Sequence, residues 1–366
     1  MNTTTRYIII GITILFIGFL LWYFSNIVAY IIAAAVLNLI GSPFMDLLGK
    51  IKVRKITIPR SIRALLTLVL LWGLFIGFFR IFIPVIANEA NELSNVDVNT
   101  IVERLENPIA RIESIYMEYN LGGEENQDLE DYVSDKLSGV LNFSFVTNLF
   151  GSLAGLLGNV FVAIFSISFI TFFLLKEENL LTEALVVLVP EKHEKNLRHA
   201  LKSVKRLLSR YFIGIILQLT GILTLVTLGM TIVGLGFKKS LLIGLAAAIL
   251  NVVPYLGPII GTTLGILLGI AFNINMEMAS MLPLIGYMLL VFLSVQAIDN
   301  VIFQPVIFSN SVNAHPLEIF LVILMAGSIG GVAGMILAIP AYTIIRVFAK
   351  EFFNNFRVVK KLTKKI

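Results

Sequence analysis

Long hydrophobic runs alternate with shorter polar connections along this chain, and eight of the runs reach the length of a membrane span. About 20 consecutive apolar residues allow a helix to cross a bilayer core about 30 Å thick. The pattern therefore predicts an all-α, polytopic membrane protein that forms a single transmembrane domain over residues 1–366. The expected segments are residues 7–25, 27–48, 64–87, 149–175, 211–235, 240–272, 281–307 and 316–349.

The sixth segment is interrupted at its centre, which predicts a broken or re-entrant helix over residues 244–271. Pro254 and Pro258 bracket Tyr255 and Gly257, and each proline removes a backbone donor and blocks a helical bond to the preceding turn. Irregular backbone at membrane depth is tolerated where protein covers it or where it lines a wet cavity. Transporters bind solutes at such breaks. An ordinary proline kink is the structural alternative.

A polar stripe interrupts the seventh segment. Gln296, Asn300 and Gln304 are four residues apart, which places them on one face of a helix, and Asp299 lies beside them. A carboxylate near the bilayer centre costs about 2.5 to 3.5 kcal/mol on insertion scales and is by default a solute, ion or proton site. We expect Asn251 of the interrupted segment to face the same cavity. The alternative is that these groups only bond to other helices.

The start of the last segment carries a candidate gate. His315 and Glu318 flank Pro316, a residue suited to the first turn of a helix. A pH-sensitive gate is one interpretation, and a capped helix start is the alternative. The same segment contains four glycines whose expected role is close helix packing. They are Gly327, Gly330, Gly331 and Gly334.

Two polar stretches have amphipathic spacing. Residues 88–148 are acid-rich and contain two runs with apolar residues at helical intervals, so they are predicted to be extracytoplasmic amphipathic helices. Their apolar stripes need cover from the bilayer surface, from each other or from a neighbouring subunit. Residues 176–210 are predicted to contain a cytoplasmic basic helix that contacts anionic lipid headgroups.

Composition and charge fix the class and the orientation. The chain is 57% hydrophobic and 14% charged, and its mean hydropathy is +0.91. Basic residues gather in residues 51–63 and in the C-terminal tail, so both termini are predicted to be cytoplasmic in a multi-pass protein of the cell membrane. Lys238 and Lys239 violate the charge rule if the fifth and sixth segments are simple spans. Two re-entrant hairpins over residues 211–272 would place both lysines inside, and the sequence leaves both arrangements open.

Several function classes are excluded or disfavoured. The chain has no cysteine, which excludes disulfides and zinc-thiolate sites, and its three histidines are scattered. No nucleotide-binding Gly-Lys-Ser/Thr motif and no nucleophile with a base at diagnostic spacing is present. We therefore expect no enzyme, no cofactor, no metal site and no nucleic-acid partner. Uphill transport, if any, would be driven by an ion gradient.

Four motifs in order resemble the autoinducer-2 exporter (AI-2E) family of prokaryotic permeases. They are residues 251–261 (NVVPYLGPIIG), 296–307 (QAIDNVIFQPVI), 313–321 (NAHPLEIFL) and 327–340 (GSIGGVAGMILAIP). The positions that fall on the family pattern are Pro254, Gly257, Pro258, Gln296, Asp299, Asn300, Pro305, His315, Pro316, Gly331, Gly334 and Pro340. The sequence departs from it at Gly214–Ile215 and at residues 237–239.

The resemblance implies an oligomeric permease of about eight spans, some members being credited with export of the quorum-sensing signal autoinducer-2 and others with sodium or lithium/proton antiport. Our leading hypothesis is a permease that exports a small polar solute, with Asn251, Tyr255 and Gln296 lining its pocket. A cation/proton antiporter would use Asp299 as the alternating site. A membrane scaffold acting through its outer helices would have no connected cavity near Asp299. The expected partners are the bilayer, the solute or a monovalent cation, and further copies of the chain.

Overall fold

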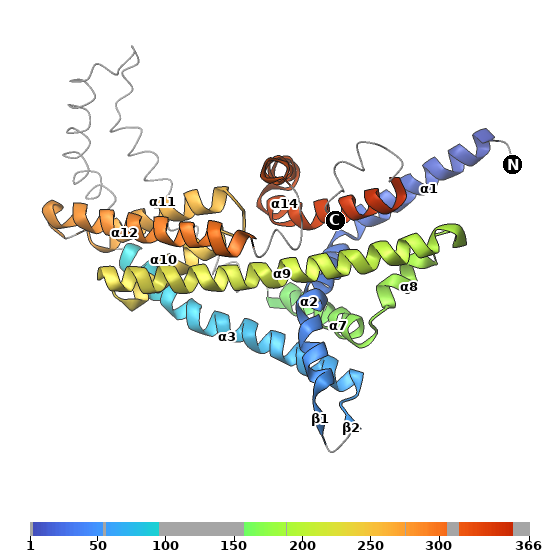
Figure 1. Ribbon diagram of the computed structural model, residues 1–366, viewed down its shortest axis with the longest axis horizontal. Helices are drawn as coiled ribbons and strands as arrows, with labels where there is room; N and C mark the ends of the chain where they lie inside the picture. The colour runs from blue at the N-terminus through green and yellow to red at the C-terminus, as the bar shows by residue number, and fades with distance from the viewer. Residues whose placement is uncertain are drawn as a thin grey trace, which may run out of the picture. The chain divides into compact units, whose positions relative to one another are not determined.

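The computed structural model describes residues 3–53, 56–94, 157–187, 189–274, 276–305 and 315–353, and within these ranges the chain is almost entirely helical (Figure 1). The elements in chain order are α1 (Thr3–Tyr23), α2 (Ser25–Lys50), β1 (Lys52–Val53), β2 (Ile56–Thr57), α3 (Arg60–Ser94), α7 (Leu157–Lys176), α8 (Leu180–Val186), α9 (Glu191–Val233), α10 (Phe237–Leu250), α11 (Leu256–Phe272), α12 (Met278–Ile298), the π-helix η1 (Asp299–Phe303) and α14 (Pro316–Phe353). The outer helices predicted at residues 88–148 lie outside the described residues from residue 95 onward.

Five helices are long and apolar enough to cross a membrane, judged by length and composition. They are Ser25–Lys50, Arg60–Glu89, Glu191–Val233, Ala279–Phe303 and Pro316–Phe352. Three shorter apolar helices, Gly11–Tyr23, Phe161–Lys176 and Leu256–Phe272, accompany them. The all-α class is confirmed, apart from one antiparallel pairing of two-residue strands between β1 and β2. The number of spans stays a prediction.

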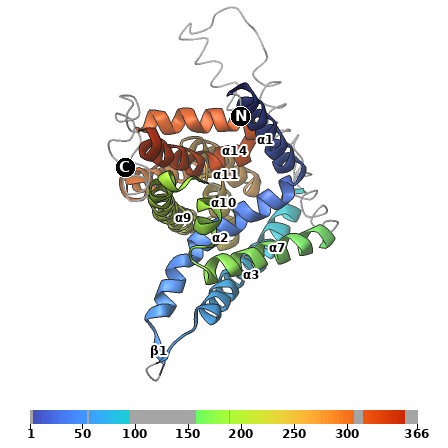
Figure 2. The ribbon, with the colours of Figure 1, turned by 90° about the vertical axis from the view of Figure 1, so that its right-hand side faces the viewer.

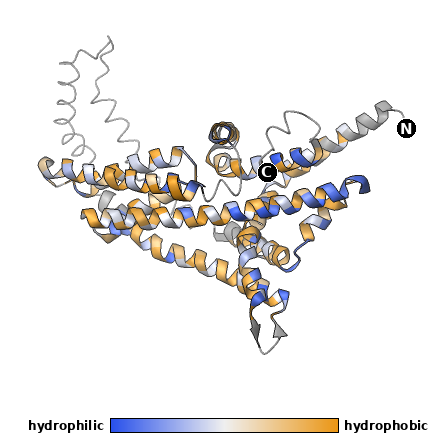
Figure 3. Ribbon diagram, viewed as in Figure 1, coloured by the Kyte–Doolittle hydropathy of each residue, from blue (hydrophilic) through white to orange (hydrophobic). Residues whose placement is uncertain are grey.

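Hydrophobic side chains cover most of the helices on their outer faces as well as inside. Figure 3 shows hydrophobic residues around nearly all helices, with hydrophilic ones gathered at the beginning of α9 and around the connection from α7 to α8. Ile232 and Ile329 illustrate the pattern, with exposed fractions of 85% and 90%. A helix that is apolar all round needs an apolar surrounding. This distribution agrees with a chain that is embedded in lipid.

The chain divides into two compact units. The first contains Met1–Ile76, Leu156–Ile213 and Thr343–Ile366, and the second contains Gly77–Gly155 and Gly214–Tyr342. In the first unit α2 and α7 lie side by side (Figure 2), and Gly41 of α2 faces the side chains of Leu175 and Thr67. A small residue at this position allows the helix backbones to approach closely.

The predicted basic helix at residues 176–210 is present only in part. α7 ends at Lys176, α8 follows, and the basic helix begins at Glu191 as the start of α9. Arg198 of α9 donates to both carboxylate oxygens of Glu183 in α8, at 2.6 and 2.9 Å, which ties the two helices together. The apolar stripe of this part of α9 is buried or half-buried in the protein, and Leu207 packs with Val347 of α14. The apolar face of this part of α9 is therefore covered by protein, and the contact of its basic face with lipid headgroups stays a prediction.

The second unit is built around an antiparallel hairpin of α10 and α11. Gly257 of α11 approaches Leu250 of α10, and Gly261 approaches Ala247. Residue numbers therefore increase along α11 while those of the facing residues in α10 decrease, as in an antiparallel pair. The segment predicted as a broken or re-entrant helix is thus broken into two helices that lie side by side, and whether it is re-entrant stays a prediction. By contrast, α9 runs without a break through residue 233, and a hairpin over residues 211–235 was a wrong alternative.

Glycines set the close contacts of this hairpin with its neighbours. Gly244 of α10 faces Thr227 of α9, and Gly265 and Gly269 of α11 face side chains of α12. The core between α9, α10, α11 and α12 consists of Ile222, Val226, Met230, Leu235, Ile243, Ala247, Ala248, Leu268, Ala271, Leu284, Met288, Phe292 and Val295. The hairpin is therefore held on two sides by packed helices.

The last helix is broken as well. Gly330 and Gly331 of α14 have non-helical backbone angles, and Gly331 has φ 57° and ψ −143°. Across the break, Gly334 approaches the carbonyl of Ala326. The glycine segment predicted as a packing surface is instead the place where the helix axis changes, with close packing at Gly327 and Gly334.

Candidate functional site

A strained turn joins the two helices of the hairpin. Tyr255 has φ 67° and ψ −48°, and the N–H of Leu256 donates to the carbonyl of Pro254 at 2.8 Å, which together define a γ-turn with Tyr255 at its centre. Among the described residues it is the one non-glycine with positive φ. Such a conformation costs about 1 to 3 kcal/mol and clusters at functional sites. The Tyr255 ring packs edge-on against Phe320 of α14, at a centroid distance of 6.0 Å.

Asp299 is the first residue of the π-helix that ends α12. The backbone N–H of Gln304 donates to the carbonyl of Asp299, five positions earlier, where an α-helix would bond four positions earlier, so the helix is wider by one residue at this turn. The side chain of Gln304 also donates to Asp299 Oδ2, at 2.9 Å. This widened turn brings Gln304 onto the carboxylate, which the four-residue spacing of an α-helix does not predict.

A second glutamine holds the other carboxylate oxygen. Gln218 Nε2 of α9 donates to Asp299 Oδ1 at 2.6 Å. Asp299 is 1% exposed and Gln218 is 6% exposed, so the bond is shielded from solvent. In the part of the chain that the structure describes, no cation forms an ion pair with Asp299. Two amide donors thus satisfy both carboxylate oxygens of Asp299, without a cationic partner among the described residues.

The predicted polar stripe is present and internally bonded. Asn300 Oδ1 accepts from Gln296 Nε2 at 3.2 Å and from Gln304 Nε2 at 2.9 Å. Gln304 therefore connects Asn300 with Asp299. The four side chains form one network on α12 and η1, with Asp299 buried at one side and Asn300 exposed at the other.

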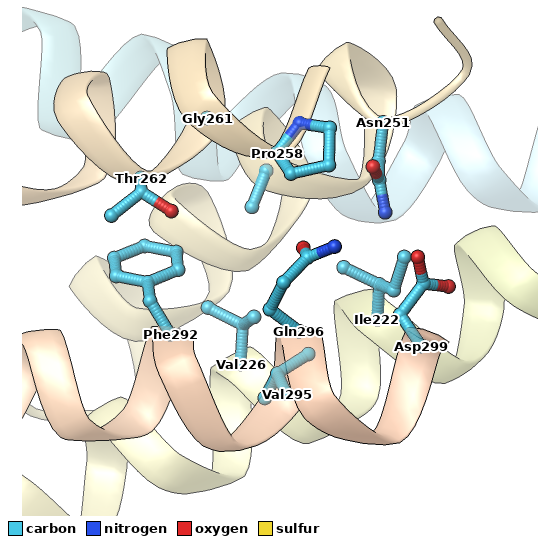
Figure 4. Close-up of a pocket in the computed structure, with 11 residues that line it drawn as sticks. Ile222, Val226, Asn251, Pro258, Gly261, Thr262, Phe292, Val295, Gln296 and Asp299 are labelled. Atoms are coloured by element: carbon cyan, nitrogen blue, oxygen red, sulfur yellow. The ribbon is translucent and has the colours of Figure 1, made fainter. Parts of the chain in front are cut away.

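A small cavity lies between the hairpin and α12. Its volume is about 20 Å³, enough for one water molecule. Figure 4 shows Asn251, at the end of α10, and Gln296 and Asp299, at the end of α12, with their polar ends turned toward the same space. The remaining walls are Ile222, Val226, Ala247, Pro258, Gly261, Thr262, Phe292 and Val295.

The structure brings some of the predicted site residues together and gives others a different place. Asn251, Pro258, Gln296 and Asp299 line the cavity. Pro254 and Tyr255 form the turn, Gly257 packs on the carbonyl of Leu250, and Asn300 and Gln304 complete the amide network.

The candidate gate residues act separately. His315 Nδ1 accepts from the N–H of Leu317 at 3.3 Å, so the imidazole caps the first turn of α14. Glu318 accepts from the hydroxyl of Tyr342 at 2.9 Å, a bond across the break in the same helix. This geometry agrees with the capped helix start, and the pH-sensitive gate stays a prediction.

Sequence reasoning missed Gln218 and Thr262. Gln218 is 81 residues from Asp299 along the chain, so no local spacing connects them. The available signal was an amide in the middle of an otherwise apolar run in α9, a feature that by itself marks a functional or packing contact in membranes. Within the described ranges, no group of three or more His, Asp or Glu side chains lies together as a metal site would require.

Comparison with known proteins agrees with this architecture. The family profile described as "AI-2E family transporter" matches residues 10–354. This chain belongs to the AI-2E transporter family. The resemblance seen in the sequence is thereby confirmed over nearly the whole chain, and the prediction of a multi-pass membrane permease is confirmed at the level of the family.

Individual AI-2E relatives cover different parts of the chain. "Putative transport protein YueF" of Bacillus subtilis (strain 168) is 26% identical over 356 residues, which cover 92% of this chain and 86% of that protein. "Putative transport protein YrrI" of the same organism is 27% identical over 60% of each chain. "Putative permease PerM" of Escherichia coli (strain K12) is 43% identical over 56 residues, 15% of this chain and 16% of PerM. All three names describe transport, and none of them names a substrate.

Proposed function

We propose that this chain is a secondary transporter that exports a small polar solute. Asp299 would bind the solute or couple its export to the movement of an ion or a proton. The observation that carries the proposal is the buried carboxylate of Asp299, which faces the cavity beside Asn251 and Gln296 and is held by two glutamine amides. The solute class includes autoinducer-2 and related metabolites. Family membership supports the transport function but leaves the solute open.

The energetics of Asp299 favour a transported charge or proton. An ionised carboxylate in an apolar surrounding is costly unless it is paired, and amide donors offset only part of that cost. A bound cation or a proton would remove the rest. Because Asp299 has no ionic partner among the described residues, a cation or a proton that enters the cavity would supply the missing partner. A partner that can enter and leave is what a coupling residue needs.

The hairpin supplies the means to open the cavity. α10 has 14 residues, which span about 21 Å and are too few to cross a core of about 30 Å. We infer that α10 and α11 form a re-entrant hairpin whose tip, Asn251 to Tyr255, lies inside the membrane beside Asp299. At 20 Å³ the cavity is far smaller than pockets for metabolites, which start at about 300 Å³. Passage of a metabolite therefore requires the hairpin to move away from α12.

The start of α10 and the end of α11 lie together. Lys239 Nζ donates to the carbonyl of Phe272 at 3.5 Å and lies 5.3 Å from the centre of the Phe272 ring. The lysine pair at the start of α10 is thus at the same end of the hairpin as the end of α11. Because α9 runs without a break from its basic start, both ends of a re-entrant hairpin lie on the opposite side of the membrane, and the two lysines stay an exception to the charge rule.

The test is transport by the purified full-length chain in liposomes. Flux of a labelled autoinducer-2-like metabolite is measured for the wild type and for Asp299→Asn, which keeps the shape and removes the charge. Glu277→Gln is the matched control, because it makes the same change at an exposed carboxylate at the other end of α12. We expect Asp299→Asn to lose at least about tenfold in flux and the control to keep it. Equal flux in both variants, with both folded, would remove Asp299 from the mechanism.

Cation/proton antiport is the second candidate, and the size of the cavity favours it. A volume of about 20 Å³ suits a water molecule or a dehydrated monovalent cation, and a carboxylate can exchange a proton for such an ion. The same liposomes, loaded with a pH gradient, test it by adding sodium or lithium. Collapse of the gradient that Asp299→Asn abolishes indicates antiport. Metabolite flux without proton movement indicates a permease. The absence of both signals, with folded protein, favours the scaffold hypothesis.

A further inference from the structure

A second, larger cavity lies in the first unit and shares no lining residue with the cavity at Asp299. It has a volume of about 470 Å³ and is formed by the end of α2, the start of α3, the end of α7 and the middle of α9. Its charged lining consists of Arg60, Arg63, Lys202, Lys205, Arg206, Arg210, Asp46 and Glu178. Six cations against two carboxylates give a strong positive excess in one concave site.

Most of these positive charges are not used inside the protein. Glu178 accepts from Arg60 at 3.1 Å and from Lys205 at 3.5 Å, so one carboxylate occupies two cations. Within the described ranges, the other four cations form no ion pair. They are Arg63, Lys202, Arg206 and Arg210. Like charges held this close repel each other, so the cavity gains stability when an anion enters.

Arg63 supplies an independent sign of a missing partner. Its Nη1 donates to the carbonyl of Met45 at 3.4 Å, which fixes the guanidinium beside the end of α2. Its Nε is buried and has no hydrogen-bond partner. Buried donors without a partner are rare, and an unobserved ligand is a common reason for one. A guanidinium presents its donors in a planar fork that matches phosphate oxygens.

The remaining lining makes the cavity amphipathic. Pro43, Met45, Leu174, Leu175 and Ile213 form its apolar part. The basic residues come from the connection and the helix ends that the charge rule assigns to the cytoplasmic side. Basic pockets between membrane helices on that side bind phosphate headgroups of lipids. The lining thus offers cations for a phosphate and apolar surface for the carbon chain next to it.

We propose that this cavity binds a phosphate-bearing anion, with Arg63, Lys202, Arg206 and Arg210 holding the phosphate. The ligand is either the headgroup of an anionic phospholipid or a soluble phosphorylated molecule. The site does not depend on the transport function proposed for Asp299. Binding there would stabilise the contacts between α2, α3 and α9, so the stability of the first unit would depend on the bound phosphate.

The experiment compares two double variants of the full-length chain in detergent. Lys202→Gln with Arg206→Gln removes two charges from the cavity. Lys192→Gln with Lys195→Gln removes two charges from exposed positions of the same helix that do not line the cavity. Native mass spectrometry measures binding of phosphatidylglycerol and of phosphatidylcholine. Thermal unfolding in lipid-free detergent measures stabilisation by inorganic phosphate and by glycerol 3-phosphate.

We expect the wild type to bind phosphatidylglycerol better than phosphatidylcholine, and the cavity variant to lose roughly tenfold or more of that affinity, since each basic residue near a membrane surface contributes about fivefold. The control variant should stay within about twofold of the wild type. Stabilisation by the soluble phosphates that only the cavity variant loses identifies a soluble ligand, whereas an effect confined to phosphatidylglycerol identifies a lipid site.

Three results would overturn the proposal. The first is equal loss in both double variants, which would mean general surface attraction. The second is no loss in either variant, and the third is a wild type that binds none of the anionic probes. If the double variant unfolds at a lower temperature, Arg206→Lys replaces it. This change keeps the charge but removes the planar fork of the guanidinium, so a loss of phosphate affinity is still expected. Lys202→Gln is measured beside it as a single variant. Unchanged affinity in both folded single variants would overturn the proposal.

Discussion

The two helix breaks of the second unit achieve a similar change of direction by opposite means. Between α10 and α11 the chain turns at Tyr255, a residue with a side chain in a backbone conformation that favours glycine, and the following Gly257 packs against the carbonyl of Leu250. In α14 the chain turns at Gly330 and Gly331, where added Cβ atoms would meet nothing within 4 Å.

The difference separates a break enforced by packing from one permitted by the backbone. A strained tyrosine persists only where the surrounding structure fixes it, and here the packing of Gly257 on Leu250 and the ring of Phe320 do so. The glycine break has little around it and relies on the freedom of glycine itself. The enforced break adjoins the cavity that contains Asp299, which is why we place the moving part of the transporter there.

Gly257→Ala should have the largest effect. The added Cβ would lie 2.1 Å from the carbonyl oxygen of Leu250 and 2.7 Å from the Cα of Asn251, so backbone must shift. We expect a loss of about 3 kcal/mol in stability, measured by denaturant titration in detergent micelles. Gly286→Ala in α12 is the control, since its Cβ would meet nothing within 4 Å. A Gly257→Ala variant as stable as this control would show that the hairpin is not packed as described.

Gly331→Ala should have an intermediate effect. Its φ of 57° with ψ of −143° lies in a region open to glycine and closed to residues with a side chain. The expected cost is about 2 kcal/mol, from backbone strain alone because the added methyl has free space. The same titration measures it. No change in stability would mean that the helix can straighten at this point without loss.

Tyr255 tests the strain in the other break through a pair of variants. Tyr255→Ala removes the ring contact with Phe320 and keeps the strain, whereas Tyr255→Gly removes both. We expect the glycine variant to be more stable than the alanine variant by about 1 kcal/mol, against the usual preference for alanine. Thermal unfolding of the two proteins side by side gives the difference, and a more stable alanine variant would contradict the γ-turn.

Gly330→Ala should have the smallest effect. Its φ of −126° and ψ of 15° are accessible to alanine, and its Cβ would meet nothing within 4 Å. We expect a change within about 0.5 kcal/mol in either direction. Measured beside Gly331→Ala, the stability of the Gly330→Ala variant shows which of the two glycines the turn requires. A loss as large as that of Gly331→Ala would place the turn across both residues.

Much of the fold was predictable because its signals are local. Runs of apolar residues gave the helices, and Pro254 and Pro258 gave the place of the first break, since a missing donor acts on its own turn. The stripe of Gln296, Asn300 and Gln304 was predictable for the same reason. The break in α14 was harder to predict, because glycines permit both close packing and a turn.

The sequence by itself determined that this is a helical membrane protein of the AI-2E family with a carboxylate in an apolar helix. Tertiary structure alone decided what surrounds that carboxylate. Gln218 reaches Asp299 from 81 residues away, and the widened turn of η1 brings Gln304 to its other oxygen. Hydrophobic periodicity records which residues avoid water, whereas the pairing of distant polar groups depends on how packed helices align, and no local spacing encodes that alignment.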